Sequence, residues 1–181
     1  MKKLTFLLLL FLPAIVFSQT LIPNVEFVGN KVLVLQAKKG AYTVTGKLST
    51  GEVIKSGCDR NACYFRIEYK GRTIEKSIGS DFSKMIIYEF DFGGDGDNEI
   101  VVVSILPGTG TSKETCWLNI YRYGKGIIEK LFEKEIMDNR TAIKKTYIEF
   151  YMPGGLDSVW SYFQGQFWLM TPVDRDKFKF K

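Results

Sequence analysis

Residues 84–105 read KMIIYEFDFGGDGDNEIVVVSI. Two runs rich in β-branched and aromatic residues, 84–90 and 99–105, flank a segment made mainly of Asp and Gly. Runs of the first kind are typical of β-strands, and Asp and Gly are typical of turns. This stretch therefore predicts two strongly apolar strands joined by an acidic loop.

The same pattern continues on both sides of this hairpin. From Val25 onward, short aromatic and β-branched runs alternate with Gly-containing turns, and long helical periodicity is rare. The further strands we expect are 31–37, 41–48, 52–56, 62–69, 72–78, 115–123, 144–152, 158–170 (one long strand or a pair bent at Gly165) and, at an edge, 176–181.

The segment Ile127–Ile136 supports two interpretations. Ile128, Phe132 and Ile136 recur at helical spacing, whereas the preceding Gly-Lys-Gly turn favours another strand, which we prefer. We therefore predict a single all-β domain, mostly antiparallel, built as a sandwich, a small barrel or a partial propeller, with this segment as the one candidate for a short helix.

Residues 1–18 have the pattern of an export signal. Two lysines precede an apolar run that is shorter than the roughly 20 residues of a membrane-spanning helix, and no later run is longer. Small side chains at Val16 and Ser18 place the expected cleavage before Gln19. We expect residues 19–181 to form one periplasmic or secreted domain without a membrane span; the alternative is an uncleaved, buried amino-terminal helix.

The composition excludes several function classes. The chain contains no His, which rules out Ser-His-Asp and Cys-His nucleophiles and His-ligated zinc. Its net charge of +5 would fall to about +3 after cleavage, and its basic residues are scattered, so we expect no nucleic-acid partner. Any enzyme built from this sequence would rely on carboxylates, Lys or Tyr.

Export to an oxidising compartment would favour a disulfide between cysteines that lie close together. Cys58 and Cys63 bracket a turn-like segment, so we expect a disulfide that fixes this turn more than it stabilises the whole fold. Cys116 lies in an apolar run beside Trp117 and is expected to be a buried small hydrophobe. A zinc site formed by the three cysteines is disfavoured, because the C-x-x-C spacing is absent.

The loop between the two central runs concentrates negative charge in a basic protein. No Lys or Arg occurs between residues 84 and 113, and five carboxylates lie close together at Glu89, Asp91, Asp95, Asp97 and Glu99. A bound cation would relieve their mutual repulsion, and the loop glycines free the backbone to wrap around it. Oxygen ligands on a flexible loop suit Ca²⁺ better than Mg²⁺. The alternative is a metal-free Gly/Asp turn.

Residues 91–101, DFGGDGDNEIV, resemble the Asp-rich loop of FG-GAP and VCBS-type repeats, known from integrin-like β-propellers. The family pattern is D-x-D-G-D-G-x-x-D/E followed by an apolar strand. The resemblance implies a Ca²⁺ site in which Asp91 is the first ligand, Asp95 the third acidic position, Asp97 a backbone carbonyl donor and Glu99 the closing carboxylate. Gly93 departs from the pattern, because the family usually has Asp or Asn there. The resemblance covers only residues 85–105, so it implies the loop and its ion and not a whole propeller.

Three function hypotheses follow. The first is an exported, non-enzymatic binding module whose Ca²⁺ site is structural and whose partner is a protein or a cell-envelope component. The second is a hydrolase, for example on glycans, that uses paired carboxylates from residues 89–99 or from Glu149 and Asp157. The third is a self-assembling or envelope structural protein.

Aromatic residues gather near the carboxyl terminus. They are Trp160, Tyr162, Phe163, Phe167 and Trp168. They suit a sugar-binding platform, but alternate core residues of a sheet, plus a few surface rings, are the preferred interpretation, since a β domain of this size needs large interior side chains.

Overall fold

The computed structural model describes residues 25–170, with gaps at 29–30, 39, 41–42, 59–61, 80–81, 83, 107–114, 125 and 137–139. The expected export signal and the expected strand 176–181 lie outside these residues. The described residues are all-β: 74% of them lie in strands and none in a helix. The strands are β1 Val25–Phe27, β2 Lys31–Lys38, β3 Val44–Lys47, β4 Val53–Cys58, β5 Cys63–Tyr69, β6 Arg72–Gly79, β7 Lys84–Phe90, β8 Glu99–Leu106, β9 Thr115–Gly124, β10 Ile127–Ile136, β11 Thr141–Ile143, β12 Tyr147–Met152, β13 Gly155–Phe163 and β14 Gln166–Leu169.

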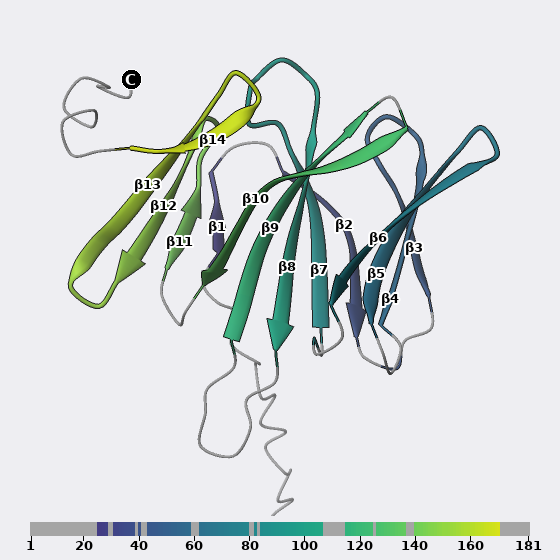
Figure 1. The fold of residues 1–181 in the computed structure, drawn as a ribbon, viewed down its shortest axis with the longest axis horizontal. Helices are drawn as coiled ribbons and strands as arrows, with labels where there is room; N and C mark the ends of the chain where they lie inside the picture. Colours follow the sequence, from purple (N-terminus) through teal and green to yellow (C-terminus); the bar gives the residue numbers. More distant parts are fainter. Residues whose placement is uncertain are drawn as a thin grey trace, which may run out of the picture.

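The strands form three sheets that lie side by side (Figure 1). Each contains four consecutive antiparallel strands: β3–β6, β7–β10 and β11–β14. The central sheet adds β2, antiparallel to β7, and the third sheet adds β1, parallel to β11. None of the sheets closes into a barrel. Four-stranded antiparallel units of this kind also form the blades of propellers.

The central sheet separates two hydrophobic cores. Met85, Ile87 and Val102 pack with Phe65 and Ile67 of the β3–β6 sheet. On the opposite face, side chains from β8, β9 and β10 pack against the β11–β14 sheet. Strand β8 is consequently buried along almost its whole length, from Glu99 to Ile105. Burial on both faces explains its run of four consecutive apolar residues, 100–103, in place of an alternating pattern.

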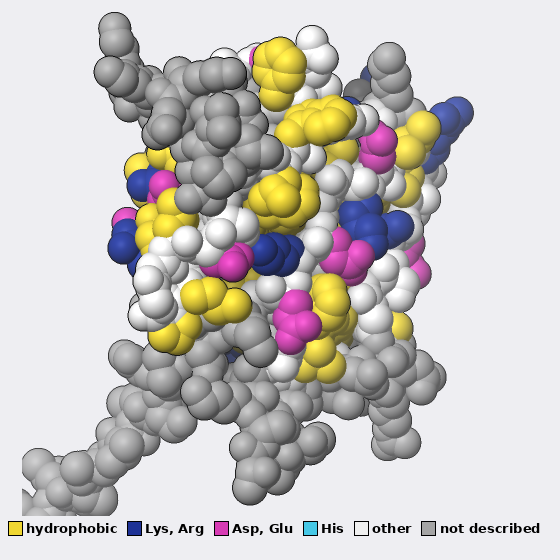
Figure 2. Space-filling model, turned by 60° about the vertical axis from the view of Figure 1, so that its left-hand side comes forward, with side chains coloured by type: hydrophobic (Ala, Val, Ile, Leu, Met, Phe, Trp, Pro, Cys, Tyr) yellow, Lys and Arg dark blue, Asp and Glu magenta, His cyan; other side chains and the backbone are white. Residues whose placement is uncertain are grey.

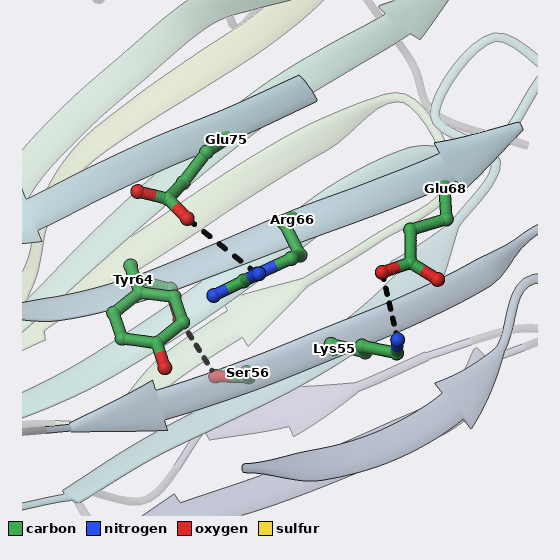
Figure 3. Close-up of polar contacts among 6 residues, drawn as sticks. All are labelled: Lys55, Ser56, Tyr64, Arg66, Glu68 and Glu75. Carbon is green, nitrogen blue, oxygen red and sulfur yellow. Dashed lines mark hydrogen bonds and ion pairs between the residues drawn. The ribbon is translucent and has the colours of Figure 1, made fainter. Parts of the chain in front are cut away.

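The β3–β6 sheet turns a polar face outward. Lys55 Nζ lies 2.7 Å from Glu68 Oε1, and Arg66 Nε lies 3.5 Å from Glu75 Oε2 on the neighbouring strand (Figure 3). The Arg66 guanidinium also lies over the ring of Tyr64, 5.2 Å from its centroid. Charged pairs of this kind across strands suit a solvated sheet surface, so the apolar side of this sheet faces the central sheet.

The segment Ile127–Ile136 is a strand, which confirms the preferred interpretation. It pairs with β9, and its register shifts between Lys130 and Phe132. Ile128 packs against the first core, whereas Phe132 and Ile136 belong to the second. A spacing of four residues is a multiple of two as well as one helical turn, so the spacing alone did not distinguish the two structures.

Both expectations about the cysteines are confirmed. Cys58 and Cys63 form a disulfide between directly paired residues of β4 and β5. Cys116 is buried and is not part of a disulfide. The disulfide lies within one hairpin and joins no two sheets.

Candidate functional site

The acidic loop, residues 91–98, joins β7 to β8 at one end of the central sheet, next to the β13–β14 hairpin (Figure 1). Phe92 is the exception in this otherwise polar loop, because its side chain is fully buried. Its ring packs edge-on against Phe90 at 4.8 Å and Phe167 at 5.0 Å between centroids. One aromatic side chain therefore anchors the loop in the core between the central and β11–β14 sheets.

Two loop aspartates organise the loop backbone. The Asp91 carboxylate accepts hydrogen bonds from the backbone N–H groups of Gly94 and Gly96, and Asp95 Oδ1 accepts one from Asp97 N at 3.0 Å. Gly94 and Gly96 have φ values of 70° and 90°, which glycine adopts without strain. These bonds give the wrapped loop conformation that the glycines predicted.

The five clustered carboxylates do not share one space. Glu89 and Glu99 are both buried, but they point to opposite faces of the central sheet. Glu89 faces the β3–β4 turn, where Ser49 donates to it from its backbone N at 2.7 Å and from its hydroxyl at 3.0 Å. Asn98 Nδ2 also donates to Ser49 Oγ, at 2.8 Å. Ser49, which gave no sequence signal, connects the loop to the β3–β6 sheet.

On the other face, Glu99 is held by the β11–β14 sheet. Its carboxylate accepts hydrogen bonds from the Tyr162 hydroxyl and, at 3.2 Å, from Phe92 N. Tyr162 in turn accepts a bond of 3.2 Å from Arg122 of β9, whose guanidinium also donates to the Gly165 carbonyl. Burial raises the pKa of Glu99, and the bond from Tyr162 opposes that rise. Burial, followed by the bond to Glu99, raises the pKa of Tyr162 to about 12.

The fold brings cationic side chains near the loop from distant parts of the sequence. Arg122 comes from a strand 23 residues beyond Glu99, and the Lys145 side chain lies against Gly94 of the loop. A Cβ atom at Gly94 would lie 2.8 Å from Lys145 Nζ. The negative charge of the loop is therefore offset partly by residues that are remote in sequence.

An open cleft of about 970 Å³ borders the loop. One wall is formed by loop residues, including Asp95 and Asp97, and another by the β9–β10 hairpin. The β13–β14 hairpin, from Tyr162 to Gly165, forms the remaining side. Three of the four predicted metal-ligating residues, Asp95, Asp97 and Glu99, line this cleft, whereas Asp91 does not.

The other predicted residues lie elsewhere. Glu149 accepts a hydrogen bond of 2.8 Å from Tyr151, while Asp157 lies 3.4 Å from Lys134 Nζ, so each carboxylate has its own local partner. Neither lines the cleft beside the acidic loop. A hydrolase that uses this pair stays a prediction.

The aromatic residues near the carboxyl terminus divide between the core and the surface, as expected for strands of a sheet. Trp160, Tyr162 and Phe167 pack into the second core, which confirms the preferred interpretation for these three rings. Phe163 and Trp168 are 63% and 58% exposed. On this side of the molecule, hydrophobic side chains are interspersed with charged ones (Figure 2).

The side-chain oxygens of the loop are of the kind that ligate Ca²⁺, but these side chains must move before they can surround an ion. The loop offers carboxylate oxygens, and an oxygen that accepts one N–H keeps a further lone pair. Within the described part of the chain, however, no three acidic or thiol side chains converge as a metal-ligand group. Asp95 and Asp97 are exposed, so rotation of their side chains is not hindered by packing.

Comparison with known proteins assigns no family. No family model, curated protein or solved structure matches this chain. No described residue belongs to a helix with the length and apolar character needed to cross a bilayer.

Proposed function

We propose that this chain is an exported, non-enzymatic binding module in which the β7–β8 loop holds a structural Ca²⁺ ion, with Asp91, Asp95, Asp97 and Glu99 as the candidate ligands. The observation that carries the proposal is the position of the loop: it is bonded to the sheets on both sides and forms one wall of the cleft. An ion there would stiffen the contact region of all three sheets and shape a surface for a protein or cell-envelope partner.

Location outside the cytoplasm is part of the proposal. The signal-like pattern of residues 1–18 supports export, and so does the Cys58–Cys63 disulfide, because disulfides persist in oxidising compartments. Extracellular modules bind Ca²⁺ with dissociation constants on the order of 0.1–1 mM. A loop that has Gly93 in place of one ligand is suited to affinities in that range.

Calorimetric titration of the purified protein with Ca²⁺ tests the metal claim. We expect saturable heat and a higher melting temperature in Ca²⁺ than in EGTA. Asp95→Asn/Asp97→Asn should weaken both effects, because the uncharged amide oxygens are poorer ligands, and it should stay folded because both side chains are exposed. Glu75→Gln, an exposed acid on β6, is the matched control and should behave as the wild type. Absence of heat and of any thermal shift in the wild type would remove the metal from the proposal.

A further inference from the structure

The cleft beside the acidic loop combines negative charge with exposed apolar side chains. Asp95, Asp97 and Glu129 contribute carboxylates to its lining. Ile127 and Phe163, at 64% and 63% exposure, contribute apolar surface. Its volume of about 970 Å³ lies at the upper end of the usual range for ligand pockets, roughly 300–1,000 Å³.

Among the described lining residues, the one cationic side chain is already engaged. Arg122 donates to the Tyr162 hydroxyl and to the Gly165 carbonyl, and its Nη1 lies 3.6 Å from Glu129 Oε2. Lys145 contacts the loop at Gly94 but is not part of the cleft lining. Asp95 and Asp97 form no ion pair with another described residue, so their charge faces the cleft without a cationic partner.

We propose that the cleft binds a basic, partly apolar peptide segment of a protein partner. Lys or Arg side chains would pair with Asp95 and Asp97, and an apolar neighbour would cover Phe163 and Ile127. Charge complementarity selects this occupant, because the carboxylates of the wall repel anionic polymers and attract cationic ones. The inference rests on the proposed function as a binding module and names the chemistry of its partner.

The test uses two synthetic peptides with the same apolar content. Acetyl-Lys-Phe-Lys-Phe-Lys-amide is the probe, and the peptide with Glu in place of every Lys is its control. Binding is measured by isothermal titration calorimetry in EGTA, so that the result does not depend on the Ca²⁺ site. We expect saturable binding of the basic peptide alone, at least a tenfold loss of affinity in Asp95→Asn/Asp97→Asn, and unchanged affinity in Glu75→Gln.

The chain itself contains Lys-Phe-Lys-Phe-Lys at residues 177–181, so self-recognition is an explicit outcome. The binding measurement is therefore repeated on Phe178→Ala/Phe180→Ala. These substitutions weaken any competition of this segment with the peptide for the cleft. Failure of the basic peptide to bind either form, or equal binding of the acidic peptide, would overturn the proposal. Self-association that is abolished by Asp95→Asn/Asp97→Asn would overturn the assignment to a separate partner and make a second copy of this chain the occupant.

Addition of Ca²⁺ separates this proposal from the metal claim. One Ca²⁺ ion neutralises only part of the negative charge of the loop, so a Ca²⁺-bound loop should bind the peptide more weakly while keeping its preference for the basic peptide. Peptide binding that is unchanged by millimolar Ca²⁺ would count against the metal site alone, while absence of peptide binding in EGTA would count against the peptide proposal alone.

Discussion

At the scale of single residues, Phe92 and Glu99 fix the two ends of the acidic loop by different forces. Phe92 contributes an apolar ring to the second core, and Glu99 contributes a buried carboxylate that accepts two hydrogen bonds. A buried charge is tolerated only when it is hydrogen-bonded. The hydrogen bond from the Tyr162 hydroxyl to Glu99 therefore stabilises the fold more than a hydrogen bond on the exposed surface would.

Substitution of Tyr162 by Phe should therefore destabilise the fold. Loss of a hydrogen bond to a buried charged group costs about 1.5–3 kcal/mol. Tyr151→Phe is the matched control, because its hydroxyl also donates to a glutamate, Glu149, on a more accessible surface. Urea unfolding should show the larger loss for Tyr162→Phe, and equal losses in the two variants would contradict the role given to Glu99.

Tyr121 should control part of the alkaline stability. Burial, followed by the nearby Glu133 carboxylate, raises the pKa of Tyr121 far above its ordinary value. The folded state keeps the phenol neutral, so its stabilising contribution is complete below about pH 10, where the unfolded phenol also stays protonated. The contribution is lost progressively as the pH rises above that value. The melting temperature of Tyr121→Phe should fall less than that of the wild type between about pH 10 and 11. Equal falls of the melting temperature in the two proteins would contradict this assignment.

At the scale of elements, the hairpins were the most predictable part of the fold. Lys70 and Gly71 both have positive φ and join β5 to β6, as the Lys-Gly pair predicted. The expected strand 144–152 begins three residues later, as β12 at Tyr147–Met152, and the short β11 at Thr141–Ile143 was not predicted. Strands of three residues, such as β1 and β11, are too short to show a periodic pattern, so only pairing with neighbours reveals them.

The disulfide belongs to this scale, because it connects neighbours in one hairpin. Replacement of both Cys58 and Cys63 by Ala removes a constraint on a short loop, for which chain entropy predicts a loss of about 2 kcal/mol. We expect a shifted urea midpoint with the fold retained, as judged by far-ultraviolet circular dichroism. Complete unfolding of the double variant would show that the disulfide stabilises more than its own hairpin.

The acidic loop was predictable from the sequence only in part. Its boundaries, its glycine turns and its acids follow from residues 84–105 alone. Its partners do not, because Ser49 lies 49 residues before Asn98 and Tyr162 lies 63 residues after Glu99. The mutual repulsion expected of the five carboxylates was also overestimated, since strand alternation places Glu89 and Glu99 on opposite faces.

At the scale of the whole molecule, the β3–β6 and β11–β14 sheets pack on the two faces of a doubly buried central sheet. The sequence shows no internal repeat, because the sheets share a strand pattern and not a residue motif. The order of the sheets was not predictable either. The one available signal was the run of consecutive apolar residues 100–103, which is typical of a strand covered on both faces.

The central claim is that the β7–β8 loop binds Ca²⁺ at a point where all three sheets meet. The most direct measurement is the ¹H–¹⁵N correlation spectrum of the protein titrated with Ca²⁺, with Asp95→Asn/Asp97→Asn as the control. We predict saturable shifts of the amides in residues 91–100, accompanied by Ser49 on one side and Tyr162 on the other, and much smaller shifts in the control at the same Ca²⁺ concentrations. A spectrum that does not change with Ca²⁺, or changes only away from the loop, would contradict the account.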